Sequence, residues 1–111
     1  MLAISCSKRQ EKPDYLIVTL EGRIDANSAK DLEQQSLTWI ENGEKNIVLD
    51  LTSVNFISSA GLRVILVIAK KLEPVQGKVK LAGLNSTLND VFEISGFSKL
   101  FVIVPKVDDA L

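Results

Sequence analysis

Five consecutive residues near the middle of the chain, Ile47-Val-Leu-Asp-Leu51, are apolar except for a single aspartate. The run is short and has polar residues on both sides, which is typical of a β-strand. A strand that is apolar on both faces is buried from both sides, as in the centre of a sheet that helices cover. We therefore expect an α/β fold built around this segment.

The segments on either side of this run alternate between strand and helix patterns. Two extended segments come first, at residues 2–7 and 15–21, and a polar turn with a proline joins them at residues 10–14. Apolar residues recur at helical spacing over residues 29–40, 62–72 and 88–95, further strands are expected at 77–82 and 100–104, and residues 52–55 are expected to form a turn. The order ββαβαβαβ predicts a small, mostly parallel sheet with an antiparallel edge strand and helices packed on it. A chain of 111 residues predicts a single domain over residues 1–111.

Small polar residues stand where each helix should begin. Asn27 or Ser28 is expected to cap the first helix, and Ser28 with Asp31 three residues later resembles a capping box. Ser86 or Thr87 is expected to cap the third. An alternative use for the nearby Asp25 is an Asx turn that leads into the first helix.

Two serines, Ser58 and Ser59, open the second helix. Unpaired backbone N–H groups and the helix dipole favour negative charge at such a position, so a phosphate there would leave the fold intact. The alternative is that the serines only cap the helix. Asp50 is expected at a strand end, where its carboxylate would accept backbone N–H bonds near Ser58, and Gly61 is expected to pack closely against a neighbour.

Composition excludes several classes of function. Histidine is absent, which rules out Ser-His-Asp and Cys-His catalysis and every histidine-ligated metal site. The single cysteine, Cys6, cannot form an internal disulfide; we expect a buried or half-buried thiol in a reducing, cytoplasmic setting. Thirteen basic against fourteen acidic residues argue against direct nucleic-acid binding. The longest apolar run, residues 64–69, is too short to insert in a membrane, which takes about 20 residues.

No enzymatic site is predicted either. A catalytic Ser59 would need a general base, and the turn around it offers neither a histidine nor a lysine. A Gly-x-Ser-x-Gly elbow is also missing, because Phe56 and Ile57 precede the serines. We therefore expect a protein that is not an enzyme and that holds no cofactor or metal.

Two linked motifs carry a resemblance to a known family. Asp50-Leu-x-x-Val-x-Phe-Ile-x-Ser-x-Gly-Leu62, preceded by Gly22-Arg-Ile-Asp25-Ala26, resembles the STAS domain family, in particular the bacterial anti-sigma factor antagonists. The resemblance covers essentially the whole chain. It implies a small sheet with helices, in agreement with the order of elements predicted above.

The resemblance also implies a partner switch. The unphosphorylated protein would bind an anti-sigma factor that is also a serine kinase, and so release the sigma factor. Phosphorylation at Ser59 would break the complex, and a serine phosphatase would restore it. A monomer suits such a transient switch. The resemblance matches Asp25 to the acidic residue that presents the site to the kinase. The residues expected to bind the partner are Asp25, Ser58, Ala60, Gly61, Leu62 and Arg63.

The chain departs from the family pattern just before the acceptor. Ser58 stands where the family usually has an acid, which either weakens recognition by a kinase or makes Ser58 the acceptor instead. Arg63, four residues after Ser59, shares a helix face with it and could pair with a phosphate, or be a solvated surface arginine. The alternative function is a constitutive STAS scaffold or a subunit of a signalling or lipid-transport assembly, which is not phosphorylated.

Overall fold

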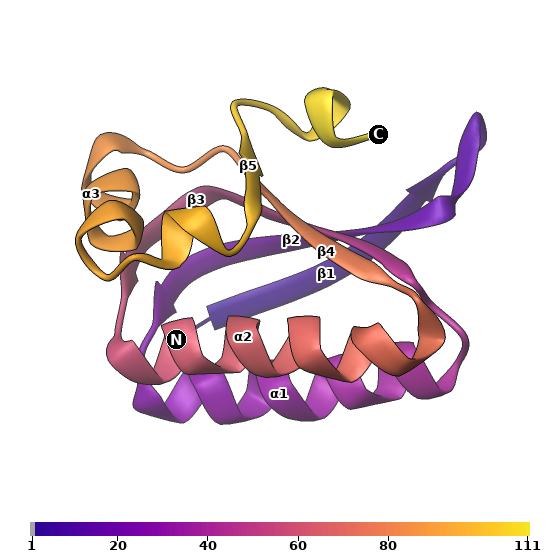
Figure 1. The fold of residues 1–111 in the computed structure, drawn as a ribbon, viewed down its shortest axis with the longest axis horizontal. Helices are drawn as coiled ribbons and strands as arrows, with labels where there is room; N and C mark the ends of the chain where they lie inside the picture. The colour runs from indigo at the N-terminus through magenta and orange to yellow at the C-terminus, as the bar shows by residue number, and fades with distance from the viewer. Residues whose placement is uncertain (1) are drawn as a thin grey trace.

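The computed structural model describes residues 2–111, which form one mixed sheet with helices packed against it (Figure 1). The strands are β1 (Leu2–Arg9), β2 (Lys12–Ile24), β3 (Asn46–Ile57), β4 (Lys78–Ala82) and β5 (Val102–Val104). The helices are α1 (Ala26–Glu41), α2 (Ser59–Leu72) and α3 (Ser86–Ile94), and the short 3-10 helices are η1 (Glu73–Val75), η2 (Phe97–Lys99) and η3 (Val107–Ala110). The predicted α/β class and the order ββαβαβαβ are confirmed.

The strands lie in the order β1-β2-β3-β4-β5, with β1 antiparallel to β2 and all other neighbours parallel. The hairpin turn consists only of Gln10 and Glu11, because Arg9 already pairs with Lys12; the predicted turn over residues 10–14 was too long. The predicted central strand does lie at the centre of the sheet. Ile47, Val48 and Leu49 are each at most 1% exposed.

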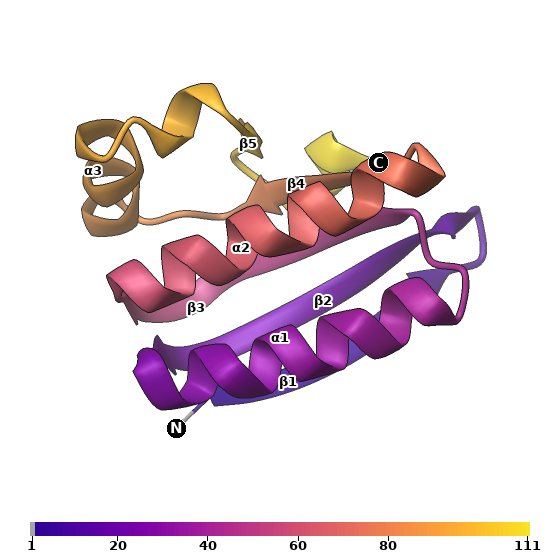
Figure 2. The same ribbon diagram turned by 60° about the horizontal axis from the view of Figure 1, so that its bottom comes forward.

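Helices α1 and α2 lie side by side on one face of the sheet, and both begin at the same end of the molecule (Figure 2). Each buries one apolar stripe, as helical spacing predicts. The buried apolar residues of the two helices are Ala29, Leu32, Trp39, Leu62, Val64, Ile65, Ile68 and Leu72. The main core therefore lies between this pair of helices and the sheet.

Strand β3 is longer than its sequence suggests. The turn predicted at residues 52–55 is wrong, because β3 continues without a break to Ile57. In a regular strand, residues three apart point to opposite faces of the sheet. Because the register of β3 against β2 shifts twice, Leu51, Val54 and Ile57 are nevertheless all buried. Such bulges absorb extra residues that a strict alternation cannot accommodate. The strand therefore leads directly into α2.

The third crossover also differs in detail from the prediction. Asn85, and not Ser86 or Thr87, caps α3: its side-chain oxygen accepts the N–H of Leu88 at 2.9 Å. Strand β5 begins at Val102, two residues later than predicted, because η2 and the exposed Leu100 occupy the preceding segment. Helix α3 lies near the end of β3 (Figure 1).

The C-terminal residues cover part of the sheet face that α1 and α2 leave free. Ala110 packs with Val48 and Ala82 in a second, smaller cluster. The ammonium group of Lys80 donates a hydrogen bond to the carbonyl oxygen of Ala110 at 3.1 Å, and Arg9 of β1 forms an ion pair with Asp108 of η3. These C-terminal residues do not reach the other end of the sheet, where α1 and α2 begin (Figure 1).

Candidate functional site

The N-termini of α1 and α2 lie next to each other because the strands that precede them end in register. Ile24 of β2 and Ile57 of β3 are Cα partners, and each is followed by the residue that caps a helix. The N–H of Ser58 donates to the carbonyl oxygen of Ile24 at 2.8 Å. The two motifs that carry the family resemblance are therefore brought together at one edge of the fold.

Asp25, and neither Asn27 nor Ser28, is the N-cap of α1. Its carboxylate accepts the N–H groups of Asn27 at 3.1 Å and Ser28 at 2.9 Å. The hydroxyl of Ser28 accepts the N–H of Asp25 at 2.9 Å and donates to the carbonyl oxygen of Arg23 at 2.8 Å. The predicted box of Ser28 with Asp31 is thus wrong; the capping box is Asp25 with Ser28, because the hydroxyl faces back along the chain.

These hydrogen bonds hold the pKa of Asp25 below its ordinary value, chiefly through the backbone N–H of Ser28 and then through the Ser28 hydroxyl. A carboxyl whose pKa is lowered by folding stabilises the fold at any pH above its unfolded value, and that contribution is lost as the pH falls through the folded value. Asp25 is therefore ionised at neutral pH and contributes a fixed negative charge beside Ser58.

The Asp25→Asn variant is expected to be less stable than the wild type at pH 7. The difference should shrink as the pH falls below about 4, the ordinary pKa of the carboxyl in the unfolded chain, toward its lowered pKa in the folded protein. Urea unfolding at pH 7 and pH 3 measures both values. Asp31→Asn is the control, because Asp31 is an exposed acid on the same helix that makes none of these cap bonds. Equal loss of stability at the two pH values would contradict the role of the carboxylate in the cap.

Ser58 and Ser59 differ in what their hydroxyls do. Ser58 is the N-cap of α2 and is half-buried; its hydroxyl oxygen accepts the N–H of Gly61 at 3.2 Å. Ser59 is the first residue of the helix, and its side chain is exposed. The sequence did not indicate which of the two serines caps α2; in the structure it is Ser58.

Gly61 packs against both strand ends, as predicted. A Cβ at this position would lie 2.7 Å from Cγ2 of Ile24 and 2.8 Å from Cγ1 of Ile57. Contacts that short do not occur between unstrained carbon atoms, so only glycine lets α2 approach the ends of β2 and β3 this closely. Gly61 therefore sets the position of Ser58 and Ser59 relative to Asp25.

The remaining residues predicted to bind a partner are not equally accessible. Arg63 is exposed and Ala60 is half-buried, whereas Leu62 is only 8% exposed and belongs to the main core. A partner that docks on this edge therefore meets Ser59 and Arg63 directly, while Gly61 and Leu62 support the surface from beneath.

Sequence reasoning missed a stacked pair beside this site. Arg23 and Phe56 are Cα partners on β2 and β3, and the guanidinium carbon lies 4.1 Å from the centroid of the ring. Phe56 is 37% exposed, which is unusual for a phenylalanine that directly precedes a buried strand end. The signal in the sequence is an aromatic residue on the polar side of β3, but its partner depends on the shifted register.

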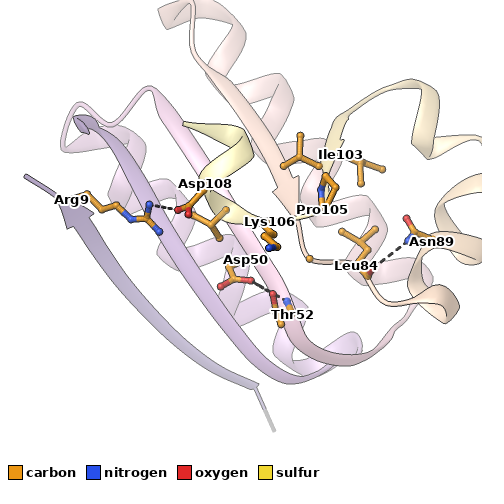
Figure 3. Close-up of a pocket in the computed structure, with 12 residues that line it drawn as sticks. Arg9, Asp50, Thr52, Leu84, Asn89, Ile103, Pro105, Lys106 and Asp108 are labelled. Carbon is orange, nitrogen blue, oxygen red and sulfur yellow. Dashed lines mark hydrogen bonds and ion pairs between the residues drawn. The ribbon is translucent and has the colours of Figure 1, made fainter. Parts of the chain in front are cut away.

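Asp50 lies away from the serines. The carboxylate accepts the N–H of Thr52 at 3.1 Å and its hydroxyl at 2.6 Å, in the middle of β3, so the predicted contact near Ser58 is wrong. It lines a groove of about 710 Å³ on the tail side of the sheet (Figure 3). Asn89, Lys106 and the Arg9–Asp108 pair line the same groove, which contains none of the predicted site residues.

Cys6 is exposed on β1, so the predicted buried or half-buried thiol is wrong. It lies on the outermost strand of the sheet, where a small side chain stays open to solvent. Partial desolvation and the nearby Glu44 carboxylate raise the pKa of the thiol, which opposes its ionisation.

Over residues 2–111, no three or more Cys, Asp or Glu side chains gather closely enough to hold a metal ion. No helix in the same residues has both the length and the apolar character to cross a membrane.

Comparison with known proteins agrees with this architecture. The family model described as the STAS domain matches residues 7–110. The Bordetella bronchiseptica protein named "Putative anti-sigma factor antagonist BtrV" is 43% identical over 88 residues, which cover 79% of this chain and 76% of that protein. The anti-sigma-B factor antagonist of Listeria monocytogenes is 29% identical over 100 residues, or 90% of this chain and 88% of that one.

Among solved structures, the anti-sigma factor antagonist SpoIIAA in its unphosphorylated form superposes with a TM-score of 0.74 at 18% identity, covering 96% of this chain and 92% of that chain. The Bacillus SpoIIAA in its phosphorylated form gives the same TM-score at 21% identity, covering 97% and 96%. These structures share the fold of the chain, and the family model matches almost its full length. The chain belongs to the STAS domain family.

Proposed function

We propose that the protein is an anti-sigma factor antagonist that is switched off by phosphorylation of Ser59. Relatives that cover most of the chain carry that name, and the solved structures with the same fold include SpoIIAA in both an unphosphorylated and a phosphorylated form. The single observation that carries the choice of residue is the contrast between the two serines. Ser58 is half-buried and uses its hydroxyl to cap α2, whereas Ser59 exposes its side chain.

The proposed partner is an anti-sigma factor that is also a serine kinase. It transfers the γ-phosphoryl group of ATP to the Ser59 hydroxyl: a new O–P bond forms, the bond between the γ-phosphorus and ADP breaks, and the serine proton passes to a base of the kinase or to water. The kinase supplies the catalytic groups, so this chain acts by binding. A serine phosphatase returns Ser59 to its free form.

The phosphate weakens the complex by changing the surface and leaves the fold in place. It brings about −1.5 to −2 charges to a surface that already holds the ionised Asp25. A partner packed against Ser59 then meets like charge and a group that is costly to desolvate. We further propose that the protein is a single domain over residues 1–111 that acts as a monomer in the cytoplasm.

Variants of the two serines test the residue assignment. Expressed with a tag in the source cells and separated on a phosphate-affinity gel, Ser59→Ala is expected to show no shifted band. Ser58→Ala should still show the band, although loss of its cap costs about 1 kcal/mol of stability. The opposite pattern would assign the phosphate to Ser58. No shifted band for the wild type under any growth condition would favour the constitutive scaffold.

A further inference from the structure

Strand β5 covers only part of the edge of β4. Its first residue, Val102, pairs with Lys80, which is the third residue of β4. Lys78 and Val79 at the start of β4 therefore have no residue of β5 opposite them. The chain before β5 forms the 3-10 helix η2 and so is not extended along this edge. The sheet thus has an open edge at the start of β4.

The backbone groups of Val79 face this open edge. In a parallel ladder, the N–H and C=O of one residue point to the same side, and successive residues alternate between the two sides. The N–H of Lys78 donates to the carbonyl oxygen of Lys45, just before β3, and that of Gly83 donates to Val104 of β5. Val79 is an even number of residues from Gly83, so its N–H points to the β5 side. Such an edge group is a template for another strand.

A groove with an apolar wall lies along the same edge. It has a volume of about 260 Å³ and lies between the second half of α2 and the segment that leads into β5 (Figure 2). Ala69 of α2, Val79 and Phe101 contribute apolar side chains to it. Small-molecule sites usually have volumes of about 300–1,000 Å³. The groove is therefore better suited to the side chains of a polypeptide than to a cofactor.

The charged residues at this groove are lysines. Lys78 lines the groove, and Lys70 and Lys99 are exposed and each adjacent in the sequence to a residue that lines it. None of the described residues that line the groove is acidic; Glu73, at the end of α2, is not one of them. The ion pairs found among residues 2–111 involve none of the three lysines. A negatively charged partner is therefore complementary to this surface.

The two faces of the open edge differ in polarity. Lys78 and Val79 are adjacent in a strand, so their side chains point to opposite faces of the sheet. Val79 is 7% exposed and packs in the main core with α2, whereas Lys78 is exposed. A strand added beside them would place alternate side chains toward Val79 and toward Lys78. Apolar pairs on one face and pairs of opposite charge on the other both stabilise neighbouring strands.

We propose that the open edge of β4 binds an extended segment of a partner protein in which apolar and acidic residues alternate, and which occupies the place of a longer β5. Backbone hydrogen bonds then supply affinity, and the alternating side chains supply specificity. Ala69 is ten residues after Ser59 on α2, which is about 15 Å along the helix axis. The docking surface is therefore separate from the proposed phosphorylation site and does not depend on it.

The test uses the full chain, labelled with nitrogen-15, and a short capped peptide in which valine alternates with glutamate. The peptide is expected to shift the amide signals of Val79, Phe101 and Val102 in NMR spectra. It should also slow hydrogen–deuterium exchange at the Val79 N–H, because that group gains an acceptor. One matched peptide has lysine in place of glutamate, and a second has the same composition with the valines and glutamates in two blocks. Both should bind more weakly.

A pair of charge reversals tests the role of Lys78. Lys78→Glu is expected to weaken binding of the valine–glutamate peptide by about fivefold, which corresponds to one exposed ion pair of about 1 kcal/mol. Lys30→Glu is the matched control, because Lys30 is exposed on α1, away from the groove, and its reversal changes the net charge equally. It should leave the affinity unchanged.

The proposal is overturned if the valine–glutamate peptide leaves exchange at Val79 unchanged, if the lysine peptide binds as well, or if both charge reversals weaken binding equally. Two other occupants would also contradict it. The same amide shifts on raising the protein concentration without peptide would show that a second copy of the chain binds this edge. Shifts produced by anionic lipid vesicles and not by the peptide would indicate a membrane surface.

Discussion

The Ser59→Asp variant is expected to bind its anti-sigma factor at least about tenfold more weakly than the wild type while keeping the same fold. Ser59 is exposed at the first position of α2, so a carboxylate there meets water and unpaired N–H groups in the free protein. In the complex it meets the partner beside the charged Asp25. Like charge at an interface costs several kcal/mol, and each 1.4 kcal/mol corresponds to tenfold in affinity.

The matched control for this effect is Ser86→Asp. Ser86 is the exposed first residue of α3, behind the cap Asn85, and so places a new carboxylate at the same helical position outside the proposed site. Titration calorimetry with the anti-sigma factor recovered from the source cells gives both affinities, and thermal melts check the fold. Equal weakening by both variants would show a general effect of charge. Unfolding of Ser59→Asp alone would mean that Ser59 is structural.

Gly61→Ala is expected to lower the free energy of unfolding by about 1–2 kcal/mol. Alanine favours a helix over glycine by about 1 kcal/mol in its interior, and less near its first turn. Against that, the new methyl group would lie under 3 Å from side-chain carbons of Ile24 and Ile57 and 3.2 Å from the Ile24 carbonyl oxygen. Overpacking a dense core costs about 1–3 kcal/mol, so the steric term exceeds the propensity gain.

Urea unfolding of Gly61→Ala measures this balance. Ser59→Ala, an exposed position in the same first turn, is the control and should differ little from the wild type. A Gly61→Ala variant as stable as the wild type would show that the ends of β2 and β3 can move apart. The close approach of α2 would then not be what positions the two serines.

The order of strands and helices could be predicted because it depends on local patterns. The apolar run at residues 47–51 and the helical spacing after residues 26 and 59 can each be recognised without knowing which other segments they pack against. The two motifs were placed at the ends of the second and third strands, and the structure brings those ends together because the carboxyl ends of parallel strands meet at one edge.

The predictions that were wrong concern features that depend on contacts between segments distant in the sequence. Three of the four residues at 52–55 are polar, which suggested a turn, yet the segment stays in β3 because its register against β2 shifts and Val54 is buried. Asn27 or Ser28 was predicted to cap α1, but the cap is Asp25, because the Ser28 hydroxyl forms hydrogen bonds back to Arg23 and Asp25. The stacking of Arg23 on Phe56 depends on the same shifted register, so no local pattern could have shown it.

The most direct test of the partner switch is intact-mass spectrometry with phosphopeptide mapping on the protein isolated from its own cells. We expect a fraction of the molecules to be heavier by about 80 Da, the mass of one phosphate, with the modification on Ser59. A phosphate on Ser58 would contradict the assignment drawn from the two hydroxyls. Absence of phosphate under every growth condition would contradict the switch itself.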